Sequence, residues 1–165
     1  MVRLSSHHLT VGSLFTGYGG LDQAVCAHYG AKVIWWSEID QFAVRVAQAH
    51  YGDGNLGDVT RVDWSNVTRP DIICGGFPCQ NLSRAGYGGG LDERWWAMVE
   101  SLRVLHPDRV VIENVGALRD RGLDVVTHSL GQIGYVGSWT SVRASDVGAC
   151  HQRDRVFLVA HPDQT

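Results

Sequence analysis

Cys79 is the residue in this sequence best suited to act as a nucleophile. It follows an apolar run over residues 71–74 that predicts a buried strand, and Gly75 and Gly76 end that strand before Pro78. A cysteine just beyond a strand end, fixed by a preceding proline, can present a thiolate to a substrate. The alternative is a turn that contains a small buried cysteine, since free cysteine is often only a packing residue.

Two further groups of reactive side chains stand next to apolar runs. Glu113 and Asn114 follow residues 109–112, an expected strand, which would place them at the ligand-binding edge of a parallel sheet. Arg153 and Arg155 precede an expected strand over residues 156–160, and they would share one face if that strand begins early. A solvated strand start with a salt bridge to Asp154 is the open alternative.

A glycine-rich turn near the N-terminus indicates a nucleotide site. Residues 9–15 read as a strand, residues 16–20 contain Gly17, Gly19 and Gly20, and residues 21–29 read as a helix. Glycines let a ligand approach the backbone closely, and the helix start offers free N–H groups. The spacing differs from the GxGxxG dinucleotide fingerprint, so the turn alone is weak support. The helix is expected to turn Leu21, Ala24, Val25 and His28 to one face.

Acidic residues lie after the second expected strand and in the short segment that follows the second expected helix. Residues 32–37 predict a second strand, with Trp35 and Trp36 as packing residues, and residues 41–50 a second helix. Glu38 at the strand end could accept hydrogen bonds from a ribose, whereas Asp40 is expected to cap the helix. Residues 55–59 are expected to lead into a third short strand. Asp58 there is either a turn residue or a partner for the amino group of an adenine.

The remaining pattern predicts the architecture. Helices are expected over residues 93–105, ended by Pro107, and over 123–133, with a strand over 134–144. Residues 81–92 are rich in glycine and would form either a closing loop or a disordered segment. Strands that alternate with helices predict an α/β fold: a mostly parallel, doubly wound sheet whose last two strands form a hairpin-like antiparallel edge.

The composition sets limits on class and compartment. The 165 residues suit one domain, and 44% apolar with 19% charged residues is typical of a soluble globular protein. A net charge of −3, with Lys32 the only lysine, argues against a basic surface along the whole chain. No apolar run approaches the roughly 20 residues of a membrane helix, and no secretory signal is evident, which favours a cytoplasmic protein.

The four cysteines are expected to be reduced thiols. A zinc site built from Cys74, Cys79, Cys150 and His151 is an alternative to a nucleophile at Cys79. The gap between Cys74 and Cys79 is wider than the usual spacing of a zinc-binding cysteine pair, and Cys74 lies in an apolar strand. We therefore expect no metal.

Taken together, these fragments resemble the DNA cytosine-5 methyltransferases, in chain order and over nearly the whole sequence. The fragments are the glycine-turn motif at 15–21, Glu38 and Asp58, Gly76-Phe77-Pro78-Cys79-Gln80, residues 91–94, Glu113-Asn114-Val115 and Arg153-Asp154-Arg155. The resemblance implies a Rossmann-like methyltransferase fold that binds S-adenosylmethionine. The residues implied to hold this cofactor are Phe15, Gly17, Gly19, Gly20, Leu21, Glu38, Ile39, Asp58, Val59 and Pro78.

The resemblance also implies a mechanism and a partner. Cys79 would attack C6 of a cytosine flipped out of DNA, and a protonated Glu113 would donate to N3. Arg155 would hold O2, Arg153 would support the nucleophile loop or the intermediate, and Asn114 would position the base and the Pro-Cys turn. The roles open to such an enzyme include restriction-modification, protection of phage DNA and regulation.

The sequence departs from the family pattern in two places. Cys150-His151 stand where the family has Pro-Gln, and the sequence stops soon after the Arg-x-Arg strand. The target-recognition domain and the last helix of full family members have no counterpart in residues 1–165. We therefore expect one catalytic domain in a minimal, split or truncated form; if the enzyme is split, a second chain should supply recognition and the missing helix. A non-catalytic remnant that binds the cofactor or DNA is the alternative.

Overall fold

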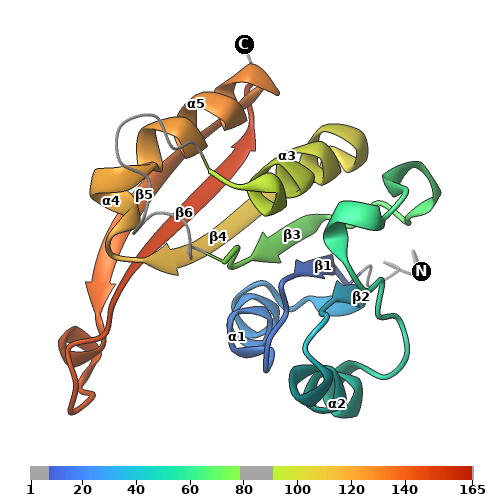
Figure 1. Ribbon diagram of the computed structural model, residues 1–165, viewed down its shortest axis with the longest axis horizontal. Coiled ribbons are helices and arrows are strands. Elements are labelled where there is room, and N and C mark those ends of the chain that lie inside the picture. The colour runs from blue at the N-terminus through green and yellow to red at the C-terminus, as the bar shows by residue number, and fades with distance from the viewer. Residues whose placement is uncertain (1–7, 79–90, 165) are drawn as a thin grey trace, which may run out of the picture.

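The computed structural model describes residues 8–78 and 91–164. Within these residues, six strands form one mixed sheet (Figure 1). The strands are β1 (Thr10–Leu14), β2 (Lys32–Ser37), β3 (Ile72–Gly75), β4 (Arg109–Val115), β5 (Tyr135–Arg143) and β6 (Asp154–Pro162). Their order across the sheet is β2-β1-β3-β4-β6-β5. The first four are parallel, and β6 runs antiparallel to both β4 and β5.

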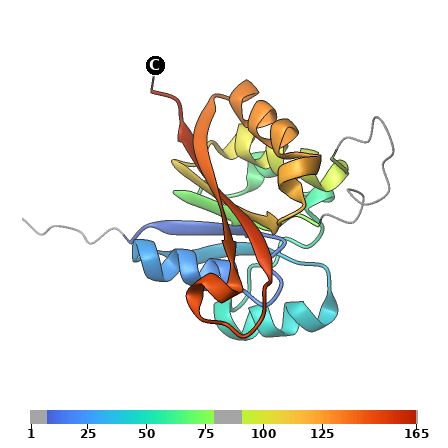
Figure 2. The ribbon, with the colours of Figure 1, turned by 90° about the vertical axis from the view of Figure 1, so that its left-hand side faces the viewer.

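Helices cover both faces of this sheet, as expected from the alternating pattern. Figure 2 shows α1 (Gly20–Tyr29) and α2 (Gln41–Tyr51) on one side of the sheet and the other α-helices on the opposite side. The latter are α3 (Glu93–Leu105), α4 (Leu118–Arg121) and α5 (Leu123–Gln132). The expected doubly wound α/β fold with an antiparallel edge is confirmed.

Local signals explain where the helices start and stop. Asp40 caps α2, because its carboxylate accepts from the backbone N–H groups of Phe42 and Ala43. Asp92 caps α3 in the same way, accepting from the N–H of Arg94. This helix ends at His106, which adopts a left-handed conformation with a φ of 45° immediately before Pro107.

The core is divided by the sheet into two unequal parts. The larger cluster lies under α3 and α5, and it includes the fully buried Trp95, Met98, Leu102, Ile73 and Ile112. A smaller cluster lies under α1; its buried members are Val11, Val25, Ile72, Cys74 and Val111. Trp35 and Trp36 are both buried, which confirms their expected packing role.

The expected third strand after residues 55–59 is wrong. Only Asn55 pairs with β2, as an isolated bridge to Trp36, and the chain then forms two 3-10 turns, η1 (Val59–Arg61) and η2 (Trp64–Asn66). Gly57 has a φ of 75° and turns the chain away from the sheet, and Asp58 caps η1. The turns pack on α3 rather than pairing with β2.

No helix within residues 8–78 and 91–164 is both long and apolar enough to cross a membrane.

Candidate active site

The parallel strands β1, β2, β3 and β4 deliver their C-terminal ends to one edge of the sheet, where most of the predicted residues lie. Cys79 itself is outside the described residues, whereas Gly75, Gly76, Phe77 and Pro78 lead up to it. A Cβ on Gly75 would lie 2.8 Å from the carbonyl oxygen of Leu14, and one on Gly76 would lie 2.9 Å from Oε2 of Glu113. The two glycines therefore allow this segment to pass close to β1 and to the carboxylate of Glu113.

Glu113 and Arg155 are brought into direct contact. Val115 of β4 lies opposite Arg155 of β6, so Glu113, two residues away on β4, shares its face. Nε of Arg155 lies 2.6 Å from Oε1 of Glu113, and both side chains are half-buried. Nη1 of Arg155 also donates to the carbonyl of Asp154, at 2.8 Å, which fixes the guanidinium. An arginine so close stabilises a carboxylate.

Arg153 does not join this pair. β6 begins at Asp154, one residue after Arg153, and Arg153 is exposed. The carboxylate of Asp154 binds Nη2 of Arg119 at 2.8 Å and accepts from Oγ of Ser141 at 2.8 Å. These hydrogen bonds, from Ser141 and then Arg119, lower the pKa of Asp154. Asp154 therefore forms its salt bridge with Arg119, and not with the neighbouring Arg153 or Arg155 as the alternative interpretation of the sequence suggested.

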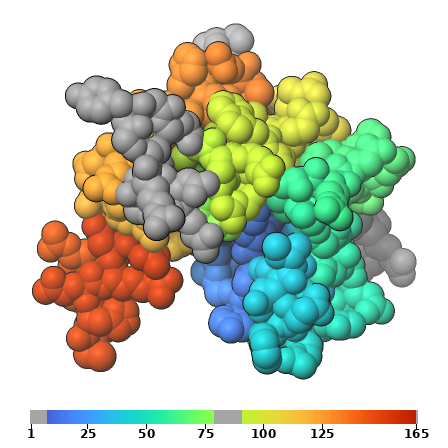
Figure 3. Space-filling model, viewed as in Figure 1, coloured from blue at the N-terminus to red at the C-terminus, as the bar shows by residue number. Residues whose placement is uncertain are grey.

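Cys150 and His151 lie in the connection between β5 and β6. Both residues are exposed, and Figure 3 shows this connection projecting from the body of the molecule. Cys74, in contrast, is buried in β3. Among the described residues, no cluster of three or more His, Cys, Asp or Glu side chains could hold a metal ion.

Asn114 ties β4 to the segment that precedes Cys79. The side chain is 3% exposed, and its Nδ2 donates to the carbonyl oxygen of Phe77 at 2.9 Å. Its Oδ1 accepts from the backbone N–H of Val115 at 2.8 Å. The amide nitrogen therefore holds the backbone at Phe77, immediately before Pro78, and the amide oxygen holds the backbone of β4 at Val115.

The glycine turn contacts Glu38. Gly17 and Gly19 adopt φ values of 55° and 81°, which favour glycine. The N–H of Gly17 donates to Oε2 of Glu38 at 2.8 Å, and the N–H groups of Ile39 and Asp40 both donate to Oε1 at 2.8 Å. Three backbone N–H groups therefore hold the carboxylate of Glu38 in place between the turn and the start of α2.

Asn55 is a site residue that the sequence did not reveal. Its Oδ1 accepts from the N–H of Glu38 at 3.1 Å, and its Nδ2 donates to the carbonyl of Glu38 at 3.0 Å. The reciprocal pair fixes the backbone at Glu38. An asparagine just after a glycine gives no sequence signal for this role, because its partner lies 17 residues away.

Asp58 is oriented by its own turn. Oδ1 of Asp58 accepts from the N–H of Thr60 at 3.0 Å and from its Oγ1 at 2.8 Å, whereas Oδ2 lies 3.8 Å from Nε of Arg61. These contacts, with the backbone of Thr60 contributing most, lower the pKa of Asp58. The carboxylate is therefore ionised, with one oxygen held by Thr60 and the other only loosely engaged by Arg61.

A cavity of about 190 Å³ lies between these groups. It is lined by Phe15, Ser37, Glu38, Ile39, Gly57, Asp58, Val59, Gly76, Pro78 and Arg94. Six of the ten predicted cofactor residues line it; Gly17, Gly19, Gly20 and Leu21 do not. Arg94 was not predicted to contribute. A larger cavity, of about 620 Å³, lies at the opposite end of β1 and β2, beside Thr10 and Lys32, and holds none of the predicted residues.

A second buried polar pair lies behind the glycine turn. Asp22, in the first turn of α1, is 2% exposed, and Sγ of Cys74 donates to its Oδ1 at 3.1 Å. Oδ2 has no hydrogen-bond partner among the described residues. Burial raises the pKa of Asp22 and that of Cys74. The expected apolar face of α1 is thus wrong in part: Asp22 and Val25 are its buried residues, and His28 is exposed.

Comparisons with known proteins agree with this geometry. Type II methyltransferase M.DsaV from Dactylococcopsis salina is 32% identical over 159 residues, which cover 92% of this chain and 45% of that protein. Type II methyltransferase M.NlaX from Neisseria lactamica is 35% identical, over 88% of this chain and 50% of that protein. The solved structure of the Entamoeba histolytica methyltransferase EhMeth has the same fold, with a TM-score of 0.75 at 18% identity over 93% of this chain and 53% of its own.

The chain thus spans about half the length of these relatives. A family model described as C-5 cytosine-specific DNA methylase matches residues 9–165, nearly the whole sequence. The chain therefore belongs to the C-5 cytosine-specific DNA methylase family.

Proposed function

We propose that this chain is the catalytic core of a DNA cytosine-5 methyltransferase, which transfers a methyl group from S-adenosylmethionine to C5 of cytosine. The observation that carries the proposal is the Glu113–Arg155 pair, set beside the backbone that leads to Cys79. Glu113 lies next to Gly76, and Asn114 binds Phe77, so these residues form one side of a site whose other side is the cavity at Glu38 and Asp58.

The chemistry requires a nucleophile because C5 of cytosine is too weakly nucleophilic to take a methyl group directly. The Cys79 thiolate would add to C6, and the electron pair displaced from the C5–C6 bond makes C5 reactive. C5 would take the methyl group as the bond between the methyl carbon and the sulfonium sulfur breaks, which leaves S-adenosylhomocysteine. Loss of the C5 proton to a base and elimination of the thiolate from C6 would then restore the ring. Cys79 lies outside the described residues, so its assignment rests on the sequence motif and on the family.

Glu113 and Arg155 would each exchange their present partner for the base. The guanidinium of Arg155 can donate to the cytosine O2, and Glu113, once protonated, can donate to N3 and withdraw electrons as the thiolate adds. The Glu113–Arg155 pair would have to open for both side chains to bind the base. Arg153, which is exposed, would act on the nucleophile loop.

The residues present fit S-adenosylmethionine, which supplies an electrophilic methyl group on a sulfonium. Glu38 would accept from the ribose hydroxyls, and Asp58 from the adenine amino group through Oδ2. The cavity, at about 190 Å³, is smaller than the ~300–1,000 Å³ usual for whole small-molecule ligands. It therefore suits the nucleoside part, and the amino-acid part would lie over the N–H groups at the start of α1, beyond Gly17 and Gly19.

We propose that recognition of the DNA sequence is supplied by a second chain or a further segment, which also completes the cofactor pocket. The bacterial relatives support action on DNA in a bacterial cytoplasm or a phage-infected cell, in restriction-modification or a related role. A non-catalytic remnant that binds the cofactor or DNA is the second candidate.

Methyl transfer tests the proposal directly. The chain is incubated with radiolabelled S-adenosylmethionine, DNA and candidate partner proteins. We expect label in DNA with the wild type and with Cys150→Ser, which removes an exposed cysteine away from the site, and none with Cys79→Ser. Equal incorporation by Cys79→Ser would rule out the mechanism. Cofactor binding without any methylation, even with a complementing protein, would favour the remnant.

A further inference from the structure

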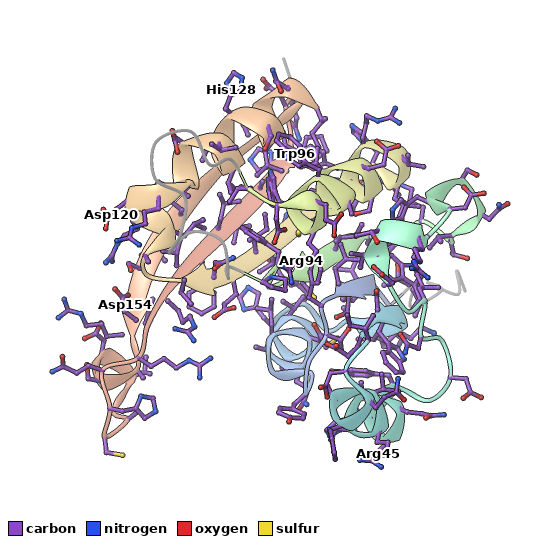
Figure 4. All side chains as sticks on the ribbon, viewed as in Figure 1. Arg45, Arg94, Trp96, Asp120, His128 and Asp154 are labelled. Atoms are coloured by element: carbon purple, nitrogen blue, oxygen red, sulfur yellow. The ribbon has the colours of Figure 1, made fainter. Side chains whose placement is uncertain are left out.

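We infer that Arg94 is a cofactor-binding residue: its guanidinium forms a wall of the Glu38–Asp58 cavity and stacks on the adenine ring. The inference rests on the proposed function, because it assumes that this cavity takes the nucleoside of S-adenosylmethionine. Arg94 is the only Lys or Arg among the described residues that line the cavity. It lies at the start of α3, near the centre of the molecule in Figure 4.

Asp92 determines how Arg94 can be used. Nε of Arg94 donates to Oδ2 of Asp92 at 3.0 Å, and Nη2 donates to the same oxygen. One edge of the planar guanidinium is thus committed to a carboxylate that also caps α3 through its Oδ1. The Arg94 side chain is 29% exposed, so it remains partly open to a ligand. A guanidinium held by its edge presents its flat faces, and these faces stack on aromatic rings.

The neighbours of Arg94 place it at the base rather than at the amino-acid end of the cofactor. Asp58 and Val59 line the same cavity and belong to the turn that packs against α3. Gly17 and Gly19, beyond which the amino-acid end would lie, do not line the cavity. The ion pair with Asp92 also partly neutralises the positive charge of Arg94, so this charge attracts the cofactor carboxylate less strongly. The aromatic base is therefore the part of the ligand that Arg94 suits.

The test measures binding of S-adenosylhomocysteine to the full chain by calorimetry. We expect Arg94→Ala to weaken binding about tenfold, as loss of a desolvated cation–π contact would. Arg94→Lys should give a smaller but measurable loss, because an ammonium can still make a cation–π contact but has no flat face to stack on the ring. Asp92→Asn, which keeps a helix-capping oxygen but loses the charge that pins Arg94, should give a smaller loss. Circular dichroism checks that each variant is folded.

A matched control is available on the same helix. Arg103 pairs with Glu100 on the exposed side of α3, far along the helix from the cavity. Arg103→Ala removes an arginine from a comparable ion pair and should leave the affinity unchanged. Equal losses in Arg94→Ala and Arg103→Ala would show an effect of net charge alone and would overturn the inference.

A shortened ligand separates the two ends of the cofactor. 5′-Methylthioadenosine keeps the adenine and ribose but lacks the amino-acid end, so Arg94→Ala should weaken its binding by the same factor as that of S-adenosylhomocysteine. If only S-adenosylhomocysteine is affected, Arg94 binds the carboxylate and the inference is wrong. If Arg94→Ala binds both ligands as the wild type does, the inference alone fails. If the wild type binds neither, the proposed function fails with it.

Discussion

Glu113 and Arg155 are bound to each other across the β4–β6 strand pair, with Oε1 and Nε 2.6 Å apart. The two groups proposed to contact the base therefore neutralise one another in this state. This arrangement keeps both side chains in position without leaving a half-buried charge unpaired. A base that enters must compete with an existing ion pair, and the chemistry depends on that exchange.

Glu113→Gln tests whether the carboxyl group is needed for chemistry rather than for the fold. The amide oxygen of the substituted side chain can still accept from Arg155, so we expect little change in melting temperature. Methyl transfer should fall by a factor of about 100 or more, because an amide cannot pass a proton to N3. Single-turnover transfer and a thermal melt measure both effects. Glu100→Gln, which breaks an exposed ion pair, is the control; transfer by Glu113→Gln within twofold of wild type would contradict the assignment.

Asn114→Ala should impair both stability and activity. It leaves the carbonyl of Phe77 and the N–H of Val115 without their partner inside a buried site. We expect a loss of about 2 kcal/mol in the free energy of unfolding, measured by urea denaturation. Asn114→Asp keeps the acceptor for Val115 but removes the donor to Phe77, so it isolates that contact. Wild-type methyl transfer by Asn114→Asp would show that the Asn114–Phe77 bond does not position Cys79.

Local signals made most of the fold predictable. The expected helix over residues 93–105 has the observed bounds, because a capping aspartate and a proline mark its ends. The expected third strand after residues 55–59 did not form, because a short segment that contains Gly-Asp can either pair or turn. Here the positive φ of Gly57 and the cap formed by Asp58 favour a turn. The sequence predicted that the last two strands form an antiparallel, hairpin-like edge, but it did not predict that β6 lies between β4 and β5.

The contacts within the site were less predictable than its members. The Glu113–Arg155 pair depends on the register between β4 and β6, which joins residues about 40 positions apart and leaves no local pattern. Asp22 was missed for a related reason. A carboxylate in an amphipathic helix normally points to water, whereas Asp22 is buried and accepts a hydrogen bond from the thiol of Cys74 on β3.

Asp22→Asn should change the pH dependence of stability. Burial raises the pKa of Asp22 in the folded state above its unfolded value of about 3.9. The contribution of Asp22 to stability is therefore fully present below about pH 4 and is lost as the pH rises through the folded-state pKa. The neighbouring titratable groups, Cys26, Cys74 and Tyr51, have raised pKa values and stay neutral through this range.

The measurement is urea denaturation of wild type and Asp22→Asn between pH 4 and pH 8. Asparagine can accept from Cys74 and cannot ionise, so the variant should gain stability relative to wild type as the pH rises. The exposed Asp124→Asn controls for the loss of one negative charge. If the free energy of unfolding changes with pH in the same way in wild type and in Asp22→Asn, burial does not raise the pKa of Asp22 as proposed.

Thr60 should act as a positioning residue for Asp58. Its N–H and its hydroxyl both bind Oδ1, at 3.0 Å and 2.8 Å, whereas Oδ2 has a long contact of 3.8 Å with Arg61 and is the oxygen proposed to bind the adenine amino group. Thr60→Val preserves the shape of the side chain and removes only the hydroxyl bond, so Asp58 should become less ordered. We expect binding of S-adenosylhomocysteine to weaken about three- to fivefold, measured by calorimetry, with Thr60→Ser close to wild type. The same loss for an analogue with hypoxanthine in place of adenine would contradict this role, because that base has no amino group for Asp58 to bind.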